Sequence, residues 1–151
     1  MKRRNNSIDY IKSDLFRYYG NYKFTSFFKG YLTNDLIRWQ IAFRMCKDSS
    51  VILKLIGNIL WTFNRSKKRI QIPKKTEIGY GLLLSHHGYV VINGTATIGD
   101  NCNIAHFVTI GSNKKQAANI GDNVYIGPNV NIIENVKIGN NVTIGAGGGS
   151  Y

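Results

Sequence analysis

The 151-residue chain is short of cysteine and contains no long hydrophobic run. Its two cysteines, Cys46 and Cys102, fall in segments of different pattern. We therefore expect neither a disulfide nor a metal site from them, and such low cysteine use is typical of an intracellular protein. The apolar stretch Val51–Phe63 is shorter than the roughly 20 residues that a membrane-spanning helix needs. No apolar run follows the basic, polar N-terminus, so the pattern of a signal peptide is absent and we expect a cytoplasmic protein.

Acidic residues are also scarce, at 8 against 20 Lys and Arg, which gives a net charge of +12. Residues 1–70 carry 15 basic and 4 acidic residues, whereas residues 71–151 are close to neutral. No nucleic-acid-binding motif accompanies the basic excess, so we expect no nucleic-acid partner. We interpret the excess as solvated helix faces. The alternative is a weak attraction to an anionic membrane surface, with the protein peripheral at the inner face of the membrane.

Residues 1–70 are predicted to form a small helical segment in front of the domain formed by residues 71–151. Apolar residues at helical spacing predict a first helix that is capped by Ser7 and ended by Gly20. A second helix is expected to begin after Asn34.

A third helix is expected to open at Ser49 or Ser50 and to run through the apolar stretch Val51–Phe63. Its apolar stripe consists of Val51, Ile52, Leu55, Ile59 and Phe63. Basic residues flank the stretch on both sides, a pattern that also suits a helix lying in a membrane interface. We favour the alternative in which the stripe packs against a partner helix or against the end of the following domain.

Isoleucine recurs with a six-residue period in the second half of the chain. The positions are Ile92, Ile98, Ile104, Ile110, Ile120, Ile126, Ile132, Ile138 and Ile144. A small or β-branched residue stands two positions before most of them, so both side chains point to the same side of a short strand. Glycine usually follows the isoleucine and asparagine often precedes it by three, and both residues tolerate left-handed backbone angles at turns. One strand and one turn every six residues, with three strands to a coil, predict a triangular β-helix.

Two irregular steps interrupt this period. It extends backward through Ile72, Ile78 and Leu84, but the step from Leu84 to Ile92 is eight residues, and the step from Ile110 to Ile120 is ten. The twelve positions correspond to about four coils. Loops on a stiff scaffold often carry function, so both irregular steps are candidate sites.

His86 and His106 each stand two residues after a repeat position and are separated by three strands, or one full coil. Strands in adjacent coils lie about 4.8 Å apart, so both imidazoles could address one ligand. Histidine is a general base near neutral pH, although the pair could also be ordinary corner residues, as we expect for His87. A zinc site needs three ligands, which these histidines would supply only if neighbouring chains shared a site, so we expect no metal. In the ten-residue step, Lys114 and Lys115 would suit an anionic cofactor.

The segment Ile72–Gly145 resembles the hexapeptide-repeat acyltransferases. It carries IGYGLLLSHHGYVVIN, VTIG and IGDNVYIGPNV. It is most similar to the serine acetyltransferase-like branch, which includes members from polysaccharide loci. The resemblance implies a mainly β fold with a left-handed parallel β-helix, a homotrimer, and acetyl-CoA as co-substrate.

The resemblance also implies roles for individual residues. His86 matches the catalytic base, which deprotonates an acceptor hydroxyl for direct attack on the thioester. His106 and Gln71 are expected at the acceptor site, and Gln71 stands where the family has an aspartate that orients the histidine. The residues expected to bind acetyl-CoA are Lys114, Lys115, Gly111, Gly127 and Gly145.

The expected function is a serine O-acetyltransferase-like activity on a small-molecule acceptor. The first alternative is an O-acetyltransferase that acts on a sugar of a capsular or other surface polysaccharide. The second is an inactive trimeric scaffold or binding protein, and a metal-dependent lyase resembling the γ-type carbonic anhydrases is a weaker third.

Overall fold

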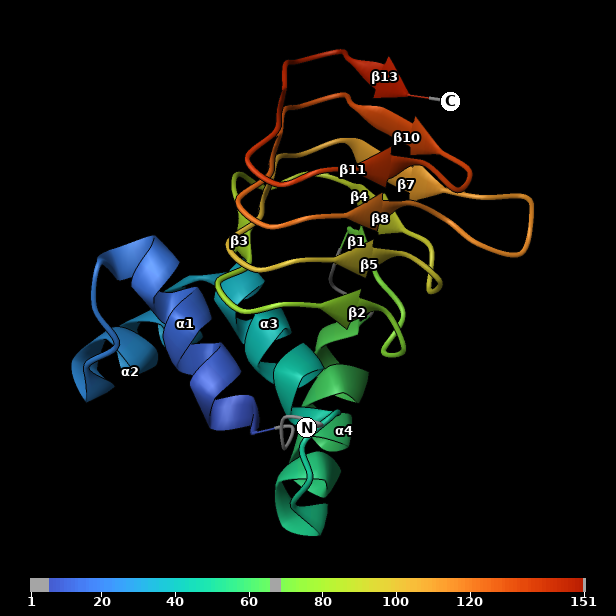
Figure 1. Ribbon diagram of the computed structural model, residues 1–151. Helices are drawn as coiled ribbons and strands as arrows, with labels where there is room; N and C mark the ends of the chain where they lie inside the picture. Colours follow the sequence, from blue (N-terminus) through green and yellow to red (C-terminus); the bar gives the residue numbers. More distant parts are fainter. Residues whose placement is uncertain (1–5, 66–68, 151) are drawn as a thin grey trace. The chain divides into compact units, whose positions relative to one another are not determined.

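The computed structural model describes residues 6–65 and 69–150 and contains two compact units. The first unit, Met1–Lys68, is helical, and the second, Arg69–Tyr151, consists of short strands (Figure 1). No helix among the described residues is both long and apolar enough to cross a membrane.

The helical unit is built around its third helix. Its described residues form α1 (Ser7–Tyr19), α2 (Phe24–Thr33), α3 (Asp35–Met45) and α4 (Val51–Arg65). The other three helices all contact α3. Eight of its residues are buried, among them polar Gln40 and charged Arg44. A helix buried on most sides needs partners for such groups.

The ends of the helices follow the capping pattern of the sequence with one shift. Asn6, rather than Ser7, caps α1, because its side chain accepts a hydrogen bond from the Ile8 N–H at 3.0 Å. Gly20 ends α1 in a left-handed conformation with φ 67°, as predicted. Asn34 caps α3, also as predicted, by accepting hydrogen bonds from the N–H groups of Leu36 and Ile37. Helix α2 was missed, although its aromatic residues recur at helical spacing; they are Phe24, Phe27, Phe28 and Tyr31.

Helix α4 packs on α3 through a face that the sequence did not single out. The Trp61 ring lies 5.5 Å from that of Trp39 and 6.0 Å from that of Phe43. A side chain at Gly57 would collide with the backbone of Met45, so this glycine lets the two helices approach closely. The five residues of the predicted stripe are instead exposed, with Val51 and Phe63 at its ends 81% and 72% accessible. The expectation that this stripe packs on a partner helix is therefore wrong.

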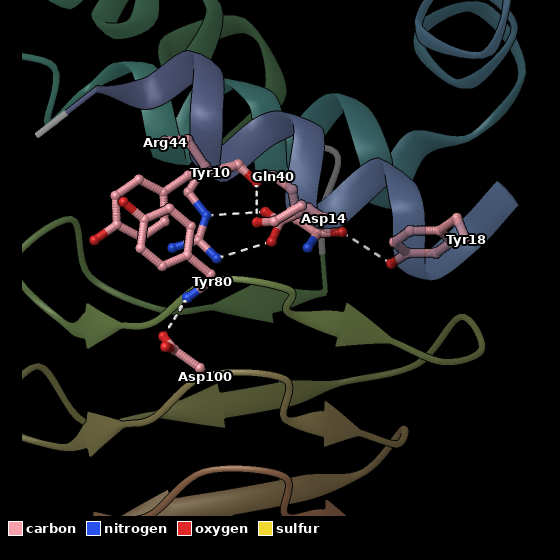
Figure 2. Close-up of polar contacts among 8 residues, drawn as sticks. Tyr10, Asp14, Tyr18, Gln40, Arg44, Tyr80 and Asp100 are labelled. Carbon is pink, nitrogen blue, oxygen red and sulfur yellow. Dashed lines mark hydrogen bonds and ion pairs between the residues drawn. The ribbon is translucent and has the colours of Figure 1, made fainter. Parts of the chain in front are cut away.

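A buried ion pair lies between α1 and α3. The Arg44 guanidinium donates to both carboxylate oxygens of Asp14, at 2.9 and 3.0 Å (Figure 2). The Arg44 guanidinium carbon also lies 4.7 Å from the centre of the Tyr10 ring. Near the pair, the Tyr18 hydroxyl donates to the side-chain oxygen of Gln40 at 2.8 Å. These contacts supply the partners that the polar side chains inside the unit require.

The second unit is a parallel β-solenoid of about four turns. In residues 69–150 the strands are β1 (Ile70–Gln71), β2 (Glu77–Ile78), β3 (Leu83–Leu84), β4 (Val90–Ile92), β5 (Thr97–Ile98), β6 (Asn103–Ile104), β7 (Val108–Gly111), β8 (Asn119–Ile120), β9 (Tyr125–Ile126), β10 (Asn131–Ile133), β11 (Lys137–Ile138), β12 (Thr143–Ile144) and β13 (Gly149–Ser150). Every third strand joins the same sheet: β1, β4, β7, β10 and β13 form sheet A, β2, β5, β8 and β11 form sheet B, and β3, β6, β9 and β12 form sheet C. The predicted mainly β solenoid is thus confirmed, while left-handed coiling stays a prediction.

The repeated isoleucines stack on one another along the inside of the solenoid. Ile98 pairs with Ile120, for example, and Ile126 with Ile144, each in parallel register. Most of the stacked isoleucines are buried. Because each coil buries its apolar face only against its neighbours, a single residue type at a fixed period specifies the whole core.

Several of the glycines that follow the isoleucines, among them Gly79 and Gly99, serve close packing rather than left-handed turns. Neither Gly79 nor Gly99 has a positive φ. A Cβ at Gly79 would collide with the carboxylate of Asp100, and a Cβ at Gly99 with that of Asp122. These carboxylates accept hydrogen bonds from the coil before, from the Tyr80 N–H at 2.8 Å and from the Asp100 N–H at 2.7 Å (Figure 2 shows the first contact). The glycines therefore make room for a ladder of side-chain oxygens at the corner between sheets B and C.

The asparagines, by contrast, do occupy left-handed positions. Their φ values lie between 56° and 60° at Asn101, Asn123, Asn129 and Asn141. Asn135 breaks the series, since Glu134 beside it takes the left-handed conformation with φ 66°. The turn role predicted for asparagine is therefore confirmed at four of the five positions.

Candidate active site

The solenoid places two histidine rings beside each other. Leu84 of β3 pairs with Ile104 of β6, and a histidine follows each of them two residues later. The ring centres of His86 and His106 lie 5.7 Å apart and the rings meet edge to face, at 84°. The pair stands at the corner between sheets C and A, as its spacing in the sequence predicts.

The eight-residue step gives this corner an unusual backbone. His86 is exposed and has φ 70°, a left-handed conformation that histidine tolerates better than most residues. Gly88 is buried, and a Cβ there would lie 2.5 Å from the Cβ of His106. The Ser85 hydroxyl donates to the side-chain oxygen of Asn103 at 3.0 Å and so ties the start of the step to the next coil. A small residue at position 88 is thus required for His106 to sit below the bulge.

One ring nitrogen of His106 makes no hydrogen bond among the described residues. Its Nδ1 is buried and has no hydrogen-bond partner within the described residues. Buried polar atoms without a partner are uncommon, because their desolvation is costly. The ring edge also faces Phe107, with the ring centres 5.0 Å apart. Because the atom is buried, a ligand would not reach it without a rearrangement of this corner.

Gln71 is not joined to the pair by any hydrogen bond among the described residues. Gln71 ends β1 on the outer face of sheet A, where it pairs with Val91 and is exposed. No hydrogen bond among the described residues links Gln71 to His86. His87 is exposed next to the pair. The same residues, 6–65 and 69–150, contain no group of three His, Cys, Asp or Glu side chains that could hold a metal ion.

The ten-residue step forms a loop that is anchored to the next coil by Glu134. The carboxylate accepts from the Ser112 hydroxyl at 2.7 Å and from the Asn113 N–H at 3.2 Å. These two hydrogen bonds, with a smaller contribution from the charge of Lys114, hold the pKa of Glu134 below its usual value. Lys114 and Lys115 are exposed on the anchored loop. The sequence did not reveal Glu134, because nothing in the repeat pattern marks which residue faces the loop.

The histidines and the lysine loop lie at opposite edges of the same face. The pair precedes β7 at the corner between sheets C and A, whereas the loop follows β7 at the corner between sheets A and B. The four residues of β7 span about 13 Å at 3.3 Å per residue. Within one chain, the histidine pair and the lysine loop are therefore separated by the width of sheet A.

The three glycines expected to approach acetyl-CoA differ in their surroundings. Gly111 ends β7 and has only ordinary contacts. A Cβ at Gly127 would lie 2.9 Å from backbone atoms of Ile144 and Ala146, so packing of the next coil already requires this glycine. Gly145 has open space around it. Gly111 and Gly145 thus leave room beside them.

Comparison with known proteins agrees with this architecture. Residues 117–148 match the family described as bacterial transferase hexapeptide (six repeats). Serine acetyltransferase 1 (chloroplastic) of Arabidopsis thaliana is 37% identical over 105 residues, which cover 66% of this chain and 31% of the relative. Among solved structures, Neisseria gonorrhoeae serine acetyltransferase in complex with serine has a TM-score of 0.69 at 28% identity, covering 93% of this chain and 60% of that one. Soybean serine acetyltransferase complexed with serine has a TM-score of 0.71 at 27% identity, with the same coverage.

The repeat, the three parallel sheets and the family match define a hexapeptide-repeat β-solenoid protein. In sequence and fold, the chain is similar to the serine acetyltransferases, a branch of the hexapeptide-repeat acyltransferases. It spans about a third of the length of the curated Arabidopsis relatives, with 31% of the first.

Proposed function

We propose that the chain transfers the acetyl group of acetyl-CoA to a hydroxyl group of a small-molecule acceptor. The observation that carries this proposal is the pairing of His86 with His106 at an exposed corner, with ring centres 5.7 Å apart. The similarity to serine acetyltransferases at 37% identity supports the same chemistry. We expect the reaction in the cytoplasm.

In the proposed reaction His86 is the general base. Its exposed imidazole accepts the proton of the acceptor hydroxyl while the hydroxyl oxygen attacks the thioester carbonyl. Collapse of the adduct breaks the carbon–sulfur bond, and the departing thiolate takes the proton back from His86. His106, whose half-buried ring lies beside that of His86, would contact the acceptor. Gln71, a neutral amide, can donate or accept a hydrogen bond at this site but does not balance the charge of an imidazolium.

Acetyl-CoA would be held by the lysine loop. Lys114 and Lys115 are exposed cations on an anchored loop, which suits the phosphate groups of CoA, and Gly111 and Gly145 leave space for close approach. The loop and the histidines of one chain are separated by the width of sheet A. We therefore propose a homotrimer in which the loop of one chain meets the histidines of its neighbour.

One candidate acceptor is L-serine, since the Neisseria gonorrhoeae and soybean enzymes were solved with serine. The alternative acceptor is a sugar hydroxyl of a surface polysaccharide. A noncatalytic trimeric scaffold is the rival from another class.

The test is the release of free CoA thiol from acetyl-CoA with a panel of L-serine and sugar acceptors. His86→Ala is expected to lose about 10²–10⁴-fold in rate, the usual contribution of a general base. His87→Ala, at the neighbouring exposed position, is the matched control and is expected to stay within a few-fold of wild type. Acceptor-dependent release that survives His86→Ala unchanged would contradict the assignment, and a folded protein that releases no thiol with any acceptor would favour the scaffold.

For the helical unit we propose weak attachment to an anionic membrane surface. The stripe along α4 is exposed, and Lys54 lies on the same helix. The basic residues Lys67 and Lys68 follow in the sequence, outside the described residues. Apolar burial combined with basic charge is how interfacial helices bind. Co-sedimentation with anionic vesicles should fall as salt is added and should weaken in Leu55→Gln; binding that is insensitive to salt would contradict the electrostatic part.

A further inference from the structure

One corner of the solenoid carries two exposed aromatic rings in adjacent coils. The register of sheet A aligns the residues that precede its strands. From the second coil onward this column consists of Tyr89, Phe107, Asn129 and Gly147. The last two have φ 58° and 70°, and they are residue types suited to a left-handed corner. The first two are large, half-exposed aromatic residues, at 49% and 46% accessibility.

Phe107 is the anomaly in this column. Its φ of 58° is the same left-handed conformation as that of Asn129 in the next coil. That conformation is unfavourable for a side chain with a Cβ, and a phenyl ring has no polar atom with which to stabilise the turn. Burial offsets the strain only in part, because nearly half of the side chain is in solvent. Backbone strain of this kind concentrates at functional sites.

The Phe107 ring adjoins the proposed catalytic pair, and Tyr89 lies next to Phe107 in the adjacent coil. The Phe107 ring meets the His106 ring at 71°, with the centres 5.0 Å apart. The Phe107 N–H donates to the carbonyl of Tyr89 at 2.6 Å, which fixes the two residues in adjacent coils. The guanidinium of Arg69 lies 5.3 Å from the centre of the Tyr89 ring. An acceptor at His86 would therefore have aromatic surface on one side.

We propose that Tyr89 and Phe107 form a platform for the acceptor, and that the acceptor is a pyranose sugar. This inference rests on the proposed acetyl transfer and selects among its acceptors. One face of a pyranose is lined with C–H groups, which pack on an aromatic ring, while the hydroxyl groups at the rim take hydrogen bonds. One such hydroxyl would donate its hydrogen bond to the exposed imidazole of His86.

The distribution of acidic residues also favours a sugar over L-serine. An amino acid has no comparable apolar face, and its ammonium group needs a carboxylate partner. The four acidic residues of the solenoid lie elsewhere. Within one chain, Glu77 is in sheet B, and Asp100 and Asp122 form the ladder at the corner between sheets B and C. Glu134 lies at the lysine loop, which the proposed trimer brings to a neighbour's histidines, but its carboxylate is already held by Ser112 and Asn113. A neutral polyol, unlike an amino acid, needs no charge at the histidine corner.

The test combines binding with kinetics on the full chain. Phe107→Asn introduces the residue that the next coil already uses at this backbone conformation, so we expect the fold and the thermal midpoint to be retained. Saturation-transfer NMR with methyl glycosides of glucose, galactose and N-acetylglucosamine, without acetyl-CoA, should show contacts to the C–H face of at least one sugar. Phe107→Asn should remove these contacts and raise the KM for that sugar about tenfold or more, with the KM for acetyl-CoA unchanged. Phe107→Tyr, which keeps the ring, should retain both.

The outcomes separate the platform from the chemistry. Equal sugar contacts in wild type and Phe107→Asn would overturn the platform, and so would the absence of contacts with any of the sugars. Thiol release that depends on L-serine and on no sugar would overturn the sugar acceptor while leaving acetyl transfer intact. Sugar contacts that require the Phe107 ring, without thiol release, would support the platform and count against acetyl transfer.

Discussion

Gly99 and Gly139 follow repeat isoleucines in the same way, yet the structure predicts opposite results for Gly→Ala at the two positions. A Cβ at Gly99 would lie 2.6 Å from backbone atoms of Gly121 and would also collide with the carboxylate of Asp122. A Cβ at Gly139 would have no atom within 4 Å. Neither glycine has a positive φ, so backbone strain does not distinguish them.

The magnitude for Gly99→Ala follows from two contributions. Overpacking against backbone that has no room to move costs about 1–3 kcal/mol. Weakening the hydrogen bond from the Asp100 N–H to the Asp122 carboxylate adds about 1–2 kcal/mol, because the carboxylate is only half-buried. The expected loss in the free energy of unfolding is therefore about 2–5 kcal/mol, or roughly 4–20 °C in melting temperature for a chain of this size. Gly139→Ala should be neutral or stabilise the protein by up to about 1 kcal/mol.

Urea denaturation followed by circular dichroism measures both variants under one condition. Equal effects of the two alanine substitutions would refute the packing explanation. They would indicate that the glycines serve the conformation of the turn, as the sequence pattern suggested.

Two further predictions follow from the polar contacts. Asp14→Leu leaves the Arg44 guanidinium buried without its partner, so the free energy of unfolding should fall by about 3–5 kcal/mol; a loss below about 1 kcal/mol in the same urea assay would contradict the burial of the pair. Glu134 has a pKa below its ordinary 4.5, so its carboxylate stabilises the lysine loop above that pH, and the contribution is lost as the pH falls through the lowered value. The amide NMR signal of Asn113 should therefore titrate with a midpoint below 4.5 and should lose this titration in Glu134→Gln, whereas a midpoint at or above 4.5 would contradict the anchoring contact.

The regular part of the fold could be predicted from the sequence because one short-range rule determines it. Isoleucine every six residues gives the strands, their pairing and their stacking, and the same count places His86 beside His106. The caps at Gly20 and Asn34 are similarly local, since each depends on a few neighbouring residues.

The rest depends on contacts between residues that no local pattern connects. The ion pair of Arg44 with Asp14 joins residues 30 positions apart in the sequence, and the anchor from Glu134 to Ser112 joins residues 22 apart. The backbone strain at Phe107 could not be predicted either. It is recognised only when Phe107 is seen to have the same backbone conformation as Asn129, which occupies the same corner in the next coil. The exposure of the apolar stripe on α4 could not be predicted for the same reason, because the stripe alone does not show that Trp61 forms the packing face.

The separation of the histidines from the lysine loop has a genetic consequence in the proposed trimer. A chain with His86→Ala and a chain with both Lys114 and Lys115 changed to Glu would each form trimers with three defective sites. In a mixed trimer, however, some interfaces join the intact histidines of one chain to the intact loop of its neighbour. Two alleles that are inactive alone would then complement each other when coexpressed. The reason is that the two halves of the site lie on opposite edges of one face, so each interface takes them from two different chains.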